Sequence, residues 1–312
     1  MRVDEFDART ASDEQLHVLH TIEQACLTEL VPGEPGRTVE ETIGYYRYPP
    51  STHERHHWIV GEAGFAALYV HTPSAVFVDL LVAPEYRRRG VGTLLVDAMR
   101  SRAADLGLAA VYGQHATAGG AAFAARLGAA AGQRDVRSLL ELGTADLPSP
   151  DLQAGWTVMT WIGSIPETHV ASYARARAAM DDAPVPDGVE IPAGDDVGRI
   201  RAMEESLRLR GRELRLTVAL DAHGEIAAFS DLRVSTGSRV AFTDDTGTVA
   251  AHRGRGLATA VKLESLRALR RDHPQVEMVT TTNAESNAAM RRINERIGFR
   301  VAAIFTTARL EL

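Results

Sequence analysis

The chain has 312 residues, of which 45% are hydrophobic and 24% charged, as in a globular protein with a sizeable core. Its formal net charge of −7 argues against general affinity for nucleic acid, so we expect no nucleic-acid partner. The N-terminus does not resemble a signal peptide, and no apolar run approaches the ~20 residues of a membrane span. A single cysteine excludes an internal disulfide. We therefore expect a cytoplasmic protein without a membrane partner.

A helix is expected to begin near residues 12–13 and to contain Cys26 as a buried structural thiol. Residues 31–53 are rich in proline and glycine and are predicted to be irregular. Residues 58–61 and 65–70 are predicted to form a hairpin.

Three histidines stand between these segments, at His53, His56 and His57. A metal site is one interpretation, but no carboxylate–histidine pattern accompanies them at ligand spacing. We therefore expect a solvated loop and no metal.

A strand, a glycine-rich turn and a helix start follow one another in the first half of the chain. Residues 76–82 are apolar and rich in β-branched side chains, and Pro84 ends this predicted strand. The turn contains Arg87-x-x-Gly90-x-Gly92, and helical spacing begins after Gly92. Small residues let a ligand approach the backbone, and the free N–H groups of a helix start favour an anion.

The same construction occurs again in the second half of the chain. Four pairs of positions are each 166 residues apart: Arg87 and Arg253, Gly90 and Gly256, Gly92 and Ala258, and Asp79 and Asp245. One constant offset predicts two copies of one domain. Because residues 143–155 are rich in proline and glycine, we expect domains at residues 1–147 and 148–312.

The predicted order in each half is helix, hairpin, strand, glycine loop, helix, strand, helix and strand. With two Arg-x-x-Gly-x-Gly/Ala loops, and with residues 287–297 followed by Gly298-Phe299, this order resembles the GNAT superfamily of N-acetyltransferases. The resemblance covers nearly the whole chain, as a tandem. It implies an α/β fold of two GNAT-like domains, each a mixed central β-sheet flanked by helices.

The resemblance implies that acetyl-CoA or CoA binds at the loops, with its pyrophosphate on the loop amides and its phosphates near arginines. A backbone N–H near Val82 or Val249 would bind the thioester carbonyl oxygen. Asn287 would bond the pantetheine arm or cap the last helix. The expected cofactor-binding residues are Val82, Arg87, Arg88, Arg89, Gly90, Val91, Gly92, Thr93, Val249, Arg253, Gly254, Arg255, Gly256, Leu257, Ala258, Thr259 and Asn287. A glycine turn that serves packing alone is the alternative, whereas a nucleotide P-loop is disfavoured because no Gly-Lys-Ser/Thr follows.

Two aspartates occupy equivalent positions on the strands before the loops. Asp79 and Asp245 are the candidate catalytic residues, because the attacking amine must lose a proton to a base. A structural or substrate-orienting carboxylate is the alternative for both. Asp244 and Glu225 are lesser candidates.

The family's usual acid is a tyrosine four residues before the Gly-Phe, where this chain has Asn294 in the second half and Ala124 in the first. A thiol with a pKa near ~8.5 can leave without a strong acid. Because the second half also has Asn283 and Asn287, where the first has small residues, we expect the second domain to carry the chemistry.

The sequence therefore predicts an acyl-CoA-dependent N-acyltransferase that moves acetyl from acetyl-CoA to the amine of a small molecule by direct attack. The alternative is a non-catalytic acyl-CoA-binding protein that serves as a sensor or scaffold. The missing tyrosines favour the alternative, whereas Asp79, Asp245 and Asn287 favour the enzyme. The acceptor is not readable, because residues 31–53 and 182–212, which would line its cleft, carry both signs of charge.

Overall fold

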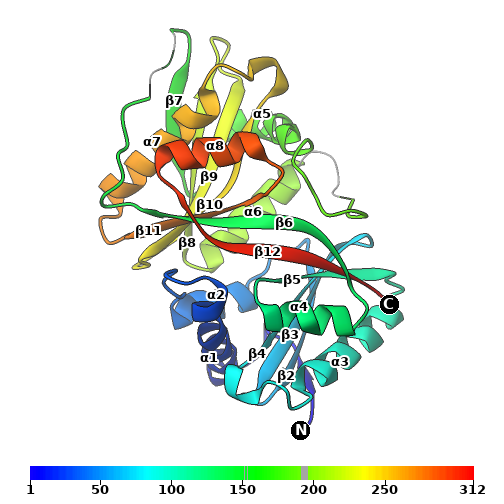
Figure 1. Cartoon of the computed structure of the whole chain (residues 1–312). Coiled ribbons are helices and arrows are strands. Elements are labelled where there is room, and N and C mark those ends of the chain that lie inside the picture. Colours follow the sequence, from blue (N-terminus) through cyan, green and yellow to red (C-terminus); the bar gives the residue numbers. More distant parts are fainter. Residues whose placement is uncertain (151, 153, 191–195) are drawn as a thin grey trace. The chain divides into compact units, whose positions relative to one another are not determined.

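The computed structural model describes residues 1–150, 152, 154–190 and 196–312 (Figure 1). The chain forms two compact units. Unit 1 contains Met1–Val136, a short segment that begins at Val185, and Ala303–Leu312. Unit 2 contains Arg137–Pro184 and, among the described residues, the chain from Asp196 to Ala302. The mixed α/β class is confirmed, and the boundary expected between residues 147 and 148 stays a prediction.

Unit 1 is built on strands in the order β1-β2-β3-β4-β5-β12. Strands β1 to β4 are antiparallel neighbours, β4 and β5 run parallel, and the end of β12 is antiparallel to β5. The elements are β1 (Asp4–Phe6), α1 (Asp13–Leu30), α2 (Val39–Arg47), β2 (Glu54–Val60), β3 (Gly64–Thr72), β4 (Ala75–Val82), the short 3-10 helix η1 (Pro84–Tyr86), α3 (Val91–Asp105), β5 (Ala110–His115), α4 (Ala118–Arg126), the first part of β6 (Ala130–Glu141) and the last part of β12 (Arg300–Glu311).

Side-chain caps determine where the first two helices begin. Ser12 and Gln15 form a capping box at the start of α1, and Thr38 and Glu41 form another at the start of α2. The expectation of an irregular segment over residues 31–53 is therefore wrong for Val39–Arg47. The prolines and glycines around this short helix concealed its start signal.

Successive side chains along a strand point to opposite faces of the sheet, so unit 1 has a hydrophobic core on each face. Phe65 packs with Leu16, Leu19 and other residues of α1 and α2. Its neighbour Ala66 points to the opposite face and packs against α3, for example against Leu95. The sheet is therefore covered by α1 and α2 on one face and by α3 on the other (Figure 1).

Unit 2 repeats this plan with strands in the order β11-β10-β9-β8-β7. Strands β10 and β11 run parallel, and the other neighbours are antiparallel. Helices α5 and α6 pack on one face of the sheet, and α7 packs on the other. The elements are β7 (Thr157–Ile162), α5 (Glu167–Arg177), the short 3-10 helix η2 (Ala178–Met180), α6 (Val197–Leu209), β8 (Arg212–Leu220), β9 (Ile226–Ser235), β10 (Val240–Thr248), the short 3-10 helix η3 (Ala250–His252), α7 (Leu257–Asp272), β11 (Met278–Ala284) and α8 (Ala288–Ile297). No described helix is long and apolar enough to cross a membrane.

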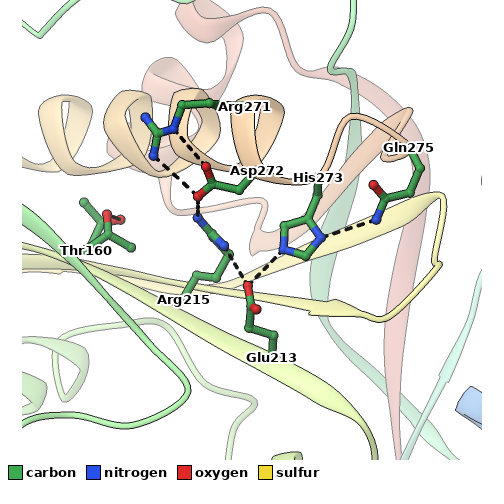
Figure 2. A network of polar contacts seen from close by, with 8 residues as sticks. Thr160, Glu213, Arg215, Arg271, Asp272, His273 and Gln275 are labelled. Carbon is green, nitrogen blue, oxygen red and sulfur yellow. Dashed lines mark hydrogen bonds and ion pairs between the residues drawn. The ribbon is translucent and has the colours of Figure 1, made fainter.

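A polar network ties the end of α7 to β8 (Figure 2). The side chain of Arg215 is only 2% exposed, and its Nη1 lies 2.6 Å from Glu213 Oε1. Its other terminal nitrogen pairs with Asp272, and His273 Nε2 lies 3.0 Å from the same Glu213 oxygen. A buried guanidinium without partners would destabilise the fold, so Arg215 needs the carboxylates of Glu213 and Asp272. The network anchors the C-terminal end of the helix whose N-terminus forms the second glycine loop.

Candidate active site

Each glycine loop begins a helix with a left-handed residue at the N-cap. Gly90 has φ 87° before α3, and Gly256 has φ 76° before α7. A Cβ built on either glycine would meet nothing within 4 Å, so the space above both loops is open. Neither helix has a side-chain cap, which leaves its first N–H groups available to an anion.

The loops differ two residues before the N-cap. Gly254 has φ 78° in the second loop, whereas Arg88 holds φ 61° at the equivalent position of the first. Arg88 is the one non-glycine residue with positive φ in the described part of the chain. Because this conformation costs an ordinary residue about 1 kcal/mol, the first loop is strained where the second is relaxed.

The first arginine of each loop is used inside the protein. Arg87 Nε donates to Val82 O over 3.1 Å, and Arg253 Nε donates to Thr248 O over 3.2 Å. Each also pairs with a carboxylate of its own unit: Glu29 with Arg87 at 2.5 Å, and Asp182 with Arg253 at 2.7 Å. These two arginines fasten the loop to the strand end. The exposed loop arginines Arg88, Arg89 and Arg255 supply positive potential.

The strand before each loop separates from its parallel neighbour. Within the described residues of unit 1, β4 pairs with β5 only at Phe77 and Tyr112. In unit 2, β10 pairs with β11 from Val240 to Thr243. In the part of the chain that the structure describes, β4 does not pair with β5, nor β10 with β11, beyond these points, so each pair of strands separates there. We call each separation a gap.

Unit 2 has a further irregularity in front of its gap. The register between β9 and β10 shifts between Thr243 and Thr246, so Asp244 and Asp245 lie in a bulge. The pairing around Asp79 in unit 1 is regular. A bulge changes the direction in which side chains point, so the two aspartates at equivalent sequence positions have different settings.

Hydrogen-bond alternation decides which backbone amides face the gaps. Val249 N–H donates to Ala227 O over 2.9 Å, so it is engaged with β9. Along an antiparallel pair the bonding side alternates, so the N–H of Thr248 points away from β9 and toward the gap. Ala83 N–H is bound to β3 in the same way, over 3.0 Å, and the N–H of Val82 points into the gap of unit 1. The open amides are therefore those of Val82 and Thr248.

Asp245 belongs to a partly buried charged cluster in unit 2. Arg177 Nη1 donates to Asp245 Oδ2 over 2.8 Å, and the aspartate side chain is 27% exposed. Burial, followed by the neighbouring Asp244, raises the pKa of Asp245 to about 6, although Arg177 acts in the opposite direction. A carboxyl with this pKa is ionised at neutral pH and is still basic enough to accept a proton.

The second carboxylate of the bulge has its own arginine. Arg233 of β9 pairs with Asp244 and also donates to the buried Asp231 over 3.0 Å. Glu225 is bound instead by Arg175 at the surface, over 2.5 Å, where both side chains are more than half exposed. The cluster is thus formed by the aspartates of β9 and β10 and does not include Glu225.

In unit 1, Asp79 accepts a hydrogen bond from Tyr69 Oη over 2.7 Å and is exposed. Because β4 is an inner strand, this exposure means that helices do not cover the sheet at Asp79. Glu23 of α1 accepts from Tyr46 Oη over 2.7 Å, and Arg37 lies 3.7 Å from the same carboxylate. Burial raises the pKa of both tyrosines, and the nearby carboxylates add to the effect. Both hydroxyls therefore remain donors.

Sequence reasoning missed the partners of these aspartates. Arg177 of α5 contacts Asp245, and Tyr69 of β3 contacts Asp79, and no sequence motif connects either pair. The available signal was Asp231 and Arg233, two charged residues in the largely buried strand over residues 226–235. Charged residues inside a buried strand indicate a cleft or a buried ion pair.

Polar side chains at α8 distinguish unit 2 further. Asn287 caps α8, accepting from Met290 N over 3.2 Å, so the capping interpretation is confirmed. Asn294 is 3% exposed, and its Nδ2 donates to Asn283 Oδ1 of β11 over 2.6 Å. Ala124 of α4, the counterpart of Asn294 in unit 1, has only a methyl group.

The comparisons with known proteins agree with this geometry. Residues 53–128 match the family described as acetyltransferase (GNAT) domain. The chain is also similar to a mycothiol acetyltransferase of Clavibacter sepedonicus, with 27% identity over 241 residues, which are 77% of this chain and 74% of the relative.

Solved GNAT structures extend the likeness to the whole chain. A tandem GNAT protein from the clavulanic acid biosynthesis pathway has a TM-score of 0.84 and 24% identity, covering 99% of this chain and 98% of that one. A GCN5-related N-acetyltransferase from Sphaerobacter thermophilus has a TM-score of 0.75 and 19% identity, covering 99% and 95%. The predicted α/β fold of two GNAT-like domains in tandem is confirmed.

GNAT proteins transfer acetyl groups from acetyl-CoA, and both loops fit this carrier. Gly90 and Gly256 leave open space above uncapped helix starts, which a pyrophosphate requires. The gaps beyond Phe77 in β4 and Thr243 in β10 leave backbone groups for an extended arm.

The histidines in and just before β2 differ from expectation. His56 and His57 lie in β2, and His57 is 3% exposed, so the expected solvated loop is wrong for His57. Burial lowers the pKa of His57 to about 4, and its neutral ring packs edge-on against Tyr46 at 5.6 Å. Among the described residues, no group of three or more histidine, cysteine or acidic side chains is placed to hold a metal ion.

Proposed function

We propose that this GNAT protein transfers the acetyl group of acetyl-CoA to the amine of a small molecule, and that unit 2 performs the reaction. The proposal depends chiefly on one observation. Asp245, with a pKa of about 6, lies in a bulge where β10 leaves β11, ahead of a relaxed glycine loop. Asp79 has a regular strand and a strained loop around it.

Each residue of unit 2 has a role in this proposal. Acetyl-CoA, when bound, supplies the acetyl group as a thioester. The amine attacks directly and forms the amide C–N bond as the thioester C–S bond breaks, and Asp245, which Arg177 orients, accepts the amine's proton. CoA leaves as a thiolate, which takes a proton from water. The N–H of Thr248 donates to the thioester carbonyl oxygen, where negative charge develops. The amides after Gly256 bind the pyrophosphate. Asn287 uses its Oδ1 in the helix cap, which leaves its Nδ2 to donate to the pantetheine arm.

A second candidate function is acyl-CoA binding without turnover, as a sensor or scaffold. The observation in its favour is the absence of an acid at the leaving group, since Asn294 and Ala124 have no proton to give. The retained carboxylate of Asp245 and its raised pKa favour the enzyme.

Thiol release separates the two candidates. The purified chain would be incubated with acetyl-CoA and a panel of primary amines, and free thiol would be measured. The one cysteine, Cys26, is 1% exposed and contributes little background. We expect amine-dependent thiol release that Gly256→Glu abolishes, because the substitution places bulk and negative charge where the pyrophosphate would bind. Calorimetric CoA binding without release by any amine would favour the second candidate, and no binding at all would refute both.

A further inference from the structure

Asn294 holds an unpaired polar atom in the interior of unit 2. Its Nδ2 donates to Asn283 Oδ1 over 2.6 Å, whereas its own Oδ1 is buried without a partner. An unsatisfied buried acceptor costs about 1–3 kcal/mol. This cost is offset if a ligand supplies the missing donor in the working state of the protein.

The position of the pair indicates where such a ligand would come from. Asn283 follows Thr281, the residue at which the pairing between β10 and β11 ends. It is half-buried, so the pair is not sealed from the gap between these strands. The N–H of Thr248 points into the same gap from β10. A ligand arm that occupies the gap would therefore pass the two asparagines.

A second unpaired atom, on the strand that carries Asn283, provides a contrast. Thr280 Oγ1 is also buried without a partner, but Thr280 is aligned with Phe242, where β10 and β11 are still paired. No ligand arm can enter between paired strands. In unit 1, Ala124 stands four residues before Gly128, as Asn294 stands before Gly298, and offers no polar atom.

We propose that Asn294 Oδ1 accepts a hydrogen bond from the arm of CoA in unit 2, and that Asn283 positions the Asn294 amide for this contact. The donor is an amide N–H of the pantetheine or the S–H of the product thiol. An asparagine side chain has no proton to transfer near neutral pH, so its role is binding and positioning. This inference rests on the proposed binding of acyl-CoA by unit 2.

Calorimetry with CoA and with desulfo-CoA, which lacks the thiol, tests the contact. The binding step of unit 2 is the one that Gly256→Glu removes. Asn294→Leu deletes the acceptor at similar volume and should raise the Kd of that step about tenfold. Thr280→Val is the matched control, because it deletes another unpaired buried oxygen of unit 2, and it should leave the Kd unchanged.

The two ligands distinguish the two donors. If the S–H is the donor, the wild type prefers CoA to desulfo-CoA and Asn294→Leu loses that preference. If an amide N–H is the donor, Asn294→Leu weakens both ligands equally. An unchanged Kd for both ligands in Asn294→Leu overturns the inference, whereas absence of CoA binding in the wild type overturns the proposed function instead.

The melting temperature without ligand gives a second readout. Asn294→Leu removes the unsatisfied oxygen together with the Nδ2 that donates to Asn283, whose half-buried amide can turn to water. The two effects oppose each other, so the Tm should stay close to that of the wild type while its Tm shift with CoA falls. A purely structural asparagine would show the reverse, with a lower Tm and an unchanged shift. If Asn294→Leu does not fold, Asn283→Ala tests the same contact, because it frees the Asn294 amide to turn. It should raise the Kd about threefold, and an unchanged Kd would refute the contact.

Discussion

The guanidinium of Arg177 donates to the carboxylate of Asp245 over 2.8 Å, yet the pKa of that carboxyl is raised rather than lowered. Burial and the neighbouring Asp244 outweigh the one arginine. Asp79 has a different environment, because its partner is the neutral hydroxyl of Tyr69 at 2.7 Å and its carboxylate is exposed. The two aspartates therefore share a sequence position but not an electrostatic setting.

The first prediction concerns the base. Asp245→Asn keeps the shape of the side chain and should lower kcat/KM by about 10²-fold or more. In the wild type, kcat/KM should rise with pH up to about 6, where the carboxyl ionises, and the variant should lack this rise. The measurement is kcat/KM between pH 5 and 9 with the best amine. Asp79→Asn is the matched control, and if it alone abolishes turnover, unit 1 is the enzyme.

Arg177 offers an independent test of the same assignment. Because this arginine lowers the pKa of Asp245, Arg177→Leu should move the acidic limb of the kcat/KM profile to higher pH. The activity at high pH should fall less than in Asp245→Asn, since the base is still present. A limb that stays in place would mean that another group titrates near pH 6.

The third prediction concerns loop strain. Arg88→Gly should stabilise unit 1 by about 1 kcal/mol, because the left-handed backbone at φ 61° suits glycine. Gly254→Ala should destabilise unit 2 by a similar amount through its backbone alone, since a Cβ there meets nothing within 4 Å. Urea denaturation of the two variants measures both effects. Equal stabilities of all three proteins would show that neither loop is strained by a side chain.

The glycine loops were predictable because their requirements are local. Gly90 and Gly256 serve as left-handed N-caps, and short sequence patterns are sufficient to find such positions. The open amide was not predictable in the same way. The family resemblance places this amide near Val82 or Val249, whereas the pairing with Ala227 engages Val249 and leaves Thr248 open. A one-residue difference in register exchanges the two sides of a strand, and the sequence does not specify that register.

Partners that come from distant elements were also beyond sequence reasoning. Arg177 precedes Asp245 by 68 positions and lies on α5, whereas Asp245 lies on β10, so no spacing rule connects them. The last residues of the chain were assigned to the second domain by their position. In the structure, Ala303–Leu312 belongs to unit 1, because Thr306 to Glu311 pair with β5. Strand order is a property of the sheet and not of neighbouring residues.

The fourth prediction concerns the link between the two halves of the chain and the end of β12. Limited proteolysis should cut between Leu147 and Gly155, since Arg267 holds Leu147 O over 2.9 Å and protects the preceding residues. The two fragments should co-elute in gel filtration, because the second carries the strand that pairs with β5. Deleting residues 303–312 should lower the Tm by more than about 5 °C, since Leu310 is part of the core of unit 1. Cleavage within 76–92 instead would show that the boundary is misplaced.

The fifth prediction concerns the only lysine of the chain. Lys262 of α7 is 1% exposed, and its Nζ lies 4.9 Å from the centre of the Phe299 ring. Burial lowers the pKa of Lys262 to about 7, from 10.5 in an exposed lysine. Between these values the unfolded chain binds more protons than the folded chain, so the free energy of unfolding should rise with pH. Below pH 7 both states are protonated, and the cost of the buried charge is constant.

Lys262→Met should therefore be more stable than the wild type by on the order of 3–5 kcal/mol at or below pH 7. The difference should shrink as the pH rises toward 10, where the folded lysine is neutral at little cost. Urea denaturation of both proteins at pH 6.5, 8 and 9.5 measures this difference, in which the contributions of other groups cancel. As a check on burial, an amine-reactive ester should label native protein only at the N-terminus and should reach Lys262 after unfolding. A difference that stays constant from pH 6.5 to 9.5 would mean that the folded lysine is charged throughout and that its ammonium is adequately solvated.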